Sequence, residues 1–272
     1  MDILPQLIAN SLIAGSIYAI LTLGFNLTYG TAKFIDMGYG VLTVIGGYSV
    51  FYFSKLLGLP LWLGALLGIV LSGLVSFLAY AFIYKPLRAR KASGAVLLIA
   101  SLGVLTALQA AIAILFTSQF QTLSGLLSGN RIFELFGGTF TAVQLSIFGI
   151  GVALFCLLAF LLKHTLFGKA VTAISDDEEV SKIVGINTDR IVGQVFFVSG
   201  AIGGLGGILI GLDTGIEPIM GLPWLLVAVV AAIVGGIGNI YGGVAGAFIL
   251  AFAENFGIWK IAGEWKSAIA FG

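Results

Sequence analysis

The chain has 272 residues, of which 59% are hydrophobic and only 9% are charged, and its mean hydropathy is +1.13. Soluble domains carry charge on about a quarter of their residues, so this composition excludes an ordinary water-soluble protein. The formal net charge of +1 offers no basic surface that would favour nucleic acid as a partner. A membrane-spanning helix needs about 20 mostly apolar residues, so residues 1–272 are expected to form a single transmembrane domain.

Apolar runs separated by polar breaks predict an all-α, polytopic membrane protein with about eight transmembrane helices. The second and seventh runs are short for a full crossing, which is typical of broken or re-entrant helices whose backbone is covered by protein. The eight runs cover residues 7–29, 38–53, 61–84, 94–116, 142–162, 191–212, 222–237 and 243–259.

Lysine and arginine concentrate in two predicted loops, residues 85–91 and 163–190. Two spans separate these loops, so both emerge on one side, which the positive-inside rule identifies as the cytoplasm. Counting back through three spans places the N-terminus outside. The chain is therefore expected to be a multi-pass protein of the cell (inner) membrane, embedded in the lipid bilayer.

Small residues recur every four positions in several spans. Such stripes let helix backbones approach closely in lipid, where packing drives association, so we interpret them as packing surfaces. They comprise Gly203, Gly207 and Gly211; Gly64, Gly68, Ser72 and Ser76; and Gly238, Gly242 and Gly246.

The loop at 163–190 contains the signature of a short helix. Ser175 followed by Glu178 matches a capping box, and Gly185 is a natural C-cap, so a helix is predicted from Ser175 to Val184. A helix of this length is too short to cross a bilayer, so it should lie at the membrane surface.

This predicted helix has one apolar face, made by Val180, Ile183 and Val184, while its first turn is acidic. It could rest in the lipid interface or dock on a protein. Four consecutive carboxylates, Asp176 to Glu179, face anionic lipid poorly, whereas a partner with basic groups would accept them. Consecutive helical positions also point in different directions, so these acids do not predict a metal site.

Catalytic and cofactor-binding motifs are missing from the sequence. The pair Gly168-Lys169 lacks the glycine and the hydroxyl residue of a phosphate-binding loop. One histidine and one cysteine supply too few parts for a conventional zinc site or a Cys-His dyad. We therefore predict a protein that is not an enzyme and that uses no cofactor or metal.

Polar residues inside spans are few, and function is expected there by default. Asp36 and Glu254 favour a functional role or a fixed pairing, because an unpaired carboxylate in hydrocarbon is costly. Ser101 lies eight residues from Gln109, so the two share a helical face, although a helix-to-helix hydrogen bond is the preferred interpretation of Ser101. The candidates for a translocation path are Asn26, Asp36, Tyr39, Ser101, Gln109, Asn239 and Glu254.

Three segments carry a family resemblance: GINTDR at 185–190, GGIGN at 235–239 with Gly242-Gly243, and GSIYAI at 15–20 with Gly24 and Tyr29-Gly30. Their joint order and spacing resemble the membrane permease of branched-chain amino-acid ABC importers. The resemblance implies the fold of type II ABC importer permeases and the transport of aliphatic amino acids. It also implies three partners: cytosolic ATPase subunits, a second permease or second copy, and an extracytoplasmic binding protein.

In that family the loop helix is the coupling helix, which docks on the ATPase. The corresponding residues here are Ser175, Asp176, Glu178, Glu179, Val180, Ile183, Val184, Gly185, Ile186 and Asn187. Asp213 and Glu217 fall at the outer end of a span, where they are candidates to contact the binding protein.

The chain departs from the family in two places. Relatives commonly read INFAHG where this chain reads IDMGYG at 35–40, which leaves an amide or urea importer as an alternative. Relatives also end in a further span, so a truncated C-terminus is expected after Gly272. An ion-coupled secondary transporter is a further alternative, and it predicts activity without any ATPase.

Overall fold

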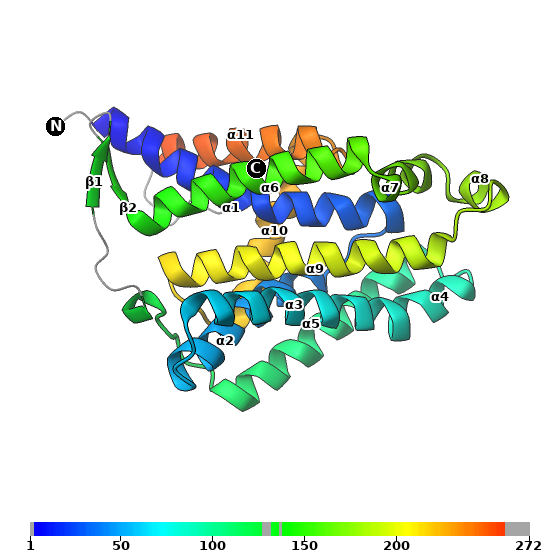
Figure 1. Cartoon of the computed structure of the whole chain (residues 1–272), viewed down its shortest axis with the longest axis horizontal. Coiled ribbons are helices and arrows are strands. Elements are labelled where there is room, and N and C mark those ends of the chain that lie inside the picture. The colour runs from blue at the N-terminus through cyan, green and yellow to red at the C-terminus, as the bar shows by residue number, and fades with distance from the viewer. Residues whose placement is uncertain (1–2, 127–131, 136–137, 259–272) are drawn as a thin grey trace.

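The computed structural model describes residues 3–126, 132–135 and 138–258, and most of its helices lie lengthwise beside one another (Figure 1). The end of the eighth predicted run and the expected truncation fall outside these residues. Over the described part, the helices are α1 (Ile3–Ala32), α2 (Tyr39–Val50), α3 (Leu61–Ala79), α4 (Lys85–Ala89), α5 (Gly94–Phe116), α6 (Ala142–His164), α7 (Leu166–Asp176), α8 (Glu178–Ile183), α9 (Thr188–Asp213), α10 (Gly221–Gly235) and α11 (Ile240–Ile258).

Every predicted apolar run forms a helix, and seven helices of the described chain are long and apolar enough to cross a membrane. The second run also forms a helix, but this helix is not among the seven. Helix α2 has only 12 residues and continues as a π-helical turn, Phe51–Leu56. A second π-helical turn, Tyr80–Tyr84, joins α3 to α4, so that the third span extends through Leu61–Ala89. The all-α, polytopic architecture is confirmed.

Helix α2 begins inside the bundle. All 12 of its residues are buried, and the hydroxyl of Tyr39 in its first turn donates a 3.0 Å hydrogen bond to the carbonyl of Leu21, in the middle of α1. The chain therefore re-enters the bundle through the non-helical residues 33–38. Irregular backbone at this depth is tolerated because protein covers it: Phe34 and Asp36 are buried.

Helices α1 and α9 form the centre of the bundle, since 72% of the most apolar window of each is buried, against 17% for α6 at the periphery. The glycine stripe of α9 faces α2. A Cβ on Gly207 would collide with the backbone carbonyl of Thr43, so only glycine permits this approach. Ser72 of α3 donates a 3.1 Å hydrogen bond to the carbonyl of Leu42, which closes the contact of α2 with α3.

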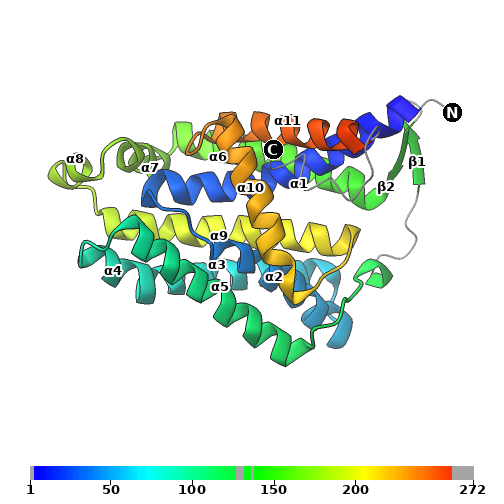
Figure 2. The same cartoon turned by 180° about the vertical axis from the view of Figure 1, so that it is seen from behind.

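The two ends of the bundle are formed by different elements. Helices α4, α7 and α8 lie at one end, and the N-terminus and a β-hairpin, β1 (Ile132–Leu135) and β2 (Gly138–Thr141), lie at the other (Figure 1). The two basic loops thus share one end, as predicted. Figure 2 shows α10 running obliquely across the other helices, from α2 to α11.

Candidate functional site

Helix α8 and the chain around it form the end of the molecule that carries the basic loops (Figure 1). The predicted cap of this helix is wrong. Ser175 lies within α7, whose own cap is Thr165, and α8 begins two residues later than Asp176, at Glu178. The Asp177 carboxylate caps it by accepting hydrogen bonds from the N–H groups of Glu179 and Val180, at 2.8 and 3.0 Å.

The predicted end of the helix is confirmed. Gly185 has a φ of +94°, which favours glycine, and its N–H donates to the carbonyl of Lys182. The N–H of Ile186 donates to the carbonyl of Ser181 at 3.0 Å, completing a Schellman motif. Two residues later Asn187 caps α9, accepting a 3.1 Å hydrogen bond from the N–H of Arg190. A rigid double turn therefore connects α8 to the central helix α9.

The apolar face of α8 is open. Val180, Ile183 and Val184 are 53%, 84% and 75% exposed, whereas Ser181 on the opposite side is buried. A contiguous exposed apolar face at the tip of a molecule is typical of an interaction surface.

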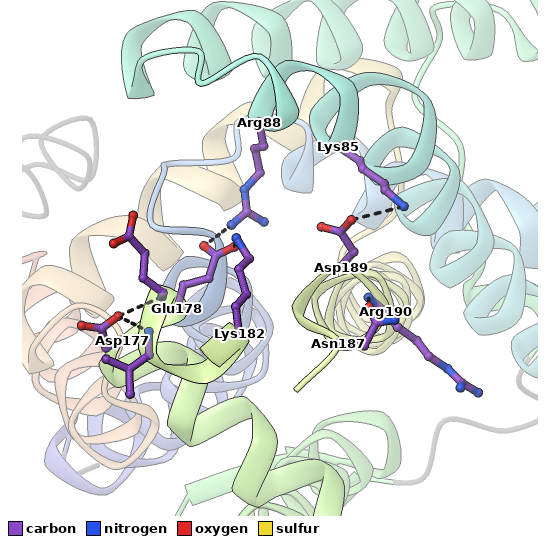
Figure 3. A network of polar contacts seen from close by, with 10 residues as sticks. Lys85, Arg88, Asp177, Glu178, Lys182, Asn187, Asp189 and Arg190 are labelled. Carbon is purple, nitrogen blue, oxygen red and sulfur yellow. Dashed lines mark hydrogen bonds and ion pairs between the residues drawn. The ribbon is translucent and has the colours of Figure 1, made fainter. Parts of the chain in front are cut away.

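An ion-pair network holds the other side of α8 (Figure 3). Arg88 of α4 donates a 2.6 Å hydrogen bond to Glu178, and Lys182 lies 2.8 Å from the same carboxylate. The side chains of Arg88 and Glu178 are only 17% and 28% exposed, so water screens this pair less than the half-exposed pair of Lys85 with Asp189 at 3.4 Å. These residues line a cavity of about 580 Å³ between α4 and the start of α9. Among the described residues, no cluster of three or more histidine, cysteine or acidic side chains is placed to hold a metal ion.

Arg88 lies one helical turn beyond Tyr84, and Tyr84 reaches the re-entrant loop. Its hydroxyl donates a 2.7 Å hydrogen bond to the Asp36 carboxylate, which also accepts one from the N–H of Gly38 at 2.9 Å. Ser101 of α5 accepts a 3.0 Å hydrogen bond from the N–H of Met37. Asp36 is thus held in a fixed pairing with Tyr84, and Ser101 makes a hydrogen bond to the backbone of Met37. Both groups hold the loop that precedes α2.

Asn26 and Asn239 also hold the backbone. Asn26 is buried and clamps the turn between α10 and α11, while the Asn239 side chain caps α11 by accepting from the N–H groups of Tyr241 and Gly242, at 3.0 and 3.1 Å. Together they line a cavity of about 420 Å³ shared with Lys163 and Ser175.

The remaining candidates fall in three places. Glu254 of α11 is buried and accepts a 2.5 Å hydrogen bond from the hydroxyl of Tyr18 in α1. Gln109 is half-buried on α5, further along the same helix than Ser101. Asp213 and Glu217 are half-buried near the end of the bundle opposite α8.

Sequence reasoning did not find Arg88 or Tyr84 as parts of this site. Arg88 served only to assign the sidedness of a loop, and Tyr84 marked the end of a span. No local pattern could have found them, because Arg88 and Glu178 are 90 positions apart in the chain.

Comparison with known proteins places these features in context. Residues 7–272 match the model of the family described as branched-chain amino acid transport system, permease component. The high-affinity branched-chain amino acid transport system permease protein BraD of Pseudomonas aeruginosa is 28% identical over 98% of this chain and 90% of its own length. LivH of Escherichia coli has the same identity and coverage.

A comparison with solved structures also shows the fold. PsaBC from Streptococcus pneumoniae, in complex with a Fab, superposes with a TM-score of 0.54 over 97% of this chain and 88% of that one. The sequences are 14% identical, so this likeness concerns the fold alone.

Proposed function

The chain belongs to the family of permease components of branched-chain amino acid transport systems, and we propose that it carries aliphatic amino acids across the cytoplasmic membrane, driven by partner ATPases. The names of the relatives BraD and LivH support this substrate class. The observation that carries the proposal is the open apolar face of α8, presented beyond the membrane helices on a capped, ion-paired support.

In this proposal α8 is the coupling helix. Val180, Ile183 and Val184 enter a groove of the ATPase, and burying three side chains that are now more than half exposed would stabilise the complex. The acidic first turn, with Glu179 exposed, meets basic groups of the ATPase. The residues from Ser175 to Asn187 position this surface.

A path of contacts would carry the movement of α8 into the bundle. Glu178 pulls on Arg88, Arg88 and Tyr84 move together because they lie on one continuous helix, and Tyr84 holds Asp36. Asp36 belongs to the loop that starts α2, so a shift of α8 would reorient a helix that begins in the middle of the bundle. A hydrogen bond or an ion pair of this kind is either formed or broken. The path therefore has the two alternative states that a conformational switch requires.

The passage itself would be mostly apolar. The candidate polar groups Asn26, Asp36 and Ser101 are engaged in hydrogen bonds with the protein, which leaves few groups to bind a strongly charged solute. Gln109 is the path candidate that makes no side-chain hydrogen bond to another described residue. Such a corridor suits an aliphatic side chain, and weak binding lets the substrate leave.

The same proposal assigns the other partners and the orientation. The end with α8 faces the cytoplasm because it carries the basic loops, and the N-terminus lies outside. Asp213 and Glu217 then face the extracytoplasmic binding protein, and a second permease, or a second copy of this chain, completes the transporter.

The test is capture of an ATPase from membranes of the native host by the tagged chain, comparing wild type with Val184→Asp. A charge in the centre of the apolar face should abolish recovery of the ATPase. Thr172→Asp, on the exposed side of the neighbouring α7, is the matched control and should retain it. Absence of an ATPase from the wild-type sample would contradict the proposal and favour an ion-coupled carrier.

Substrate is tested in vesicles reconstituted with the captured assembly. ATP-dependent uptake of labelled leucine, isoleucine and valine is expected. Uptake of urea or a short amide in their place would establish the alternative that the IDMGYG segment leaves open.

A further inference from the structure

Two neighbouring cavities on the flank of the bundle form one continuous groove. The first, of about 590 Å³, lies among α1, α3, α6 and α9, and the second, of about 460 Å³, lies at the start of α9. Phe77 of α3 and Gln194 of α9 line both. The groove therefore runs along α3 and α9 towards the end that carries α8.

The two parts of the groove differ in chemistry. Among the described residues that line the first cavity, Gln194 is the one polar side chain, and the others are leucine, phenylalanine and valine side chains such as Leu74, Leu158 and Phe197. The second cavity is lined by Lys85, Asn187, Asp189 and Arg190 beside the aromatic rings of Phe77 and Tyr80. An apolar channel thus leads into a polar pocket.

The polar pocket has an excess of positive charge. Lys85 and Arg190 outweigh Asp189, whose ion pair with Lys85 is long at 3.4 Å and half exposed. Arg190 makes no ion pair within the described residues, and Figure 3 shows its side chain extending away from the Lys85–Asp189 pair. The pocket also lies at the N-terminal end of the 26-residue helix α9, whose dipole favours an anion there.

We propose that this groove binds an anionic phospholipid of the leaflet on the α8 side, with an acyl chain along Leu74, Leu158 and Phe197 and its phosphate against Arg190 and Lys85. The arrangement matches the order of chemistry along a phospholipid, from the apolar acyl chain to the charged phosphate. Basic pockets between membrane helices on the cytoplasmic side hold anionic headgroups for the same reason. The proposal depends on membrane insertion and not on the transported substrate or the ATPase.

Native mass spectrometry of the purified full chain, supplied with phosphatidylglycerol or phosphatidylcholine, tests this assignment. The wild type should retain phosphatidylglycerol in preference to phosphatidylcholine. Arg190→Gln should lower that preference about fivefold, the effect expected for one basic residue near an anionic headgroup. The matched control Arg90→Gln, a basic residue at the same end that lines neither cavity, should leave it unchanged.

A second variant tests the apolar part. Gln194→Trp fills the junction of the two cavities from an exposed position and should reduce retention of both lipids, and Leu74→Trp, also on an exposed position, should do the same. Inorganic phosphate should not displace the lipid, because the acyl chain contributes to binding. Retention by Arg190→Gln equal to that of Arg90→Gln would overturn the proposal. So would a photoreactive residue at position 194 that crosslinks to a protein subunit and not to lipid.

Discussion

The side-chain amide of Asn26 binds the backbone around Asn239 as one peptide group binds another. It donates a 3.0 Å hydrogen bond to the carbonyl of Asn239 and accepts a 2.9 Å hydrogen bond from the N–H of Gly238. Gly236 and Gly238 have φ values of +95° and +83°, and within the turn the N–H of Asn239 donates a 3.0 Å hydrogen bond to the carbonyl of Gly236. The Asn26 amide ties this turn between α10 and α11 to α1.

Replacing Asn26 with leucine should destabilise the protein by about 1–3 kcal/mol, because the carbonyl of Asn239 and the N–H of Gly238 lose their partner in two partly buried hydrogen bonds. Thermal unfolding in detergent measures the loss. Asn10→Leu on the same helix is the control, since Asn10 is exposed and its one side-chain hydrogen bond within the described residues is accepted from Gln6 in a solvent-exposed contact. Equal melting temperatures for the two variants would contradict the role of Asn26.

Breaking the pair of Arg88 with Glu178 should uncouple transport from ATP hydrolysis. With Arg88→Gln or Glu178→Gln, we expect the ATPase to be captured normally while substrate moved per ATP falls about fivefold, the scale of 1 kcal/mol. The double variant should be no worse than either single one, because both act through one contact. Additive losses, or a similar loss in Arg90→Gln, would show that the pair does not transmit the movement.

The hydroxyl of Tyr84 should matter more than that of another buried tyrosine. Tyr84→Phe removes a 2.7 Å hydrogen bond to Asp36, and hydrogen bonds to charged groups contribute about 1.5–3 kcal/mol. Tyr48→Phe removes a buried hydroxyl that has no hydrogen-bond partner in the part of the chain that the structure describes, so it should be neutral or slightly stabilising. The test compares the unfolding midpoints and the transport rates of both variants. If Tyr84→Phe changed neither, Asp36 would not be part of the proposed path.

The glycine stripe of α9 predicts a contrast between two alanine substitutions. Gly207→Ala places a methyl group against the backbone of Thr43 and should force α9 away from α2, with loss of folded protein. Gly103→Ala, on α5, meets no atom within 4 Å and should stabilise its helix by up to about 1 kcal/mol. The yield of folded protein and its melting temperature measure the effect of each substitution. Normal folding of Gly207→Ala would show that this approach tolerates a side chain.

The candidate site could be predicted from the sequence only in part, and α8 shows where the limit falls. The exposed face of Val180, Ile183 and Val184 follows from helical spacing, and the end of the helix follows from Gly185, because these signals act within a few residues. The start of α8 could not be predicted from the neighbouring residues alone. Ser175 and Asp177 are both good caps, and the buried residues Val171 and Ile174 extend α7 through Ser175, so Asp177 became the cap.

The sequence was enough to predict the class of protein, the place of its apolar helices and the common end of its basic loops, since hydropathy and charge act on each segment independently. Only the tertiary structure decided that α2 starts inside the bundle, that Asp36 pairs with Tyr84 and that Arg88 supports α8. Those contacts join residues far apart in the chain. Their partners are chosen by how the helices pack, where close glycine contacts set the distance between backbones.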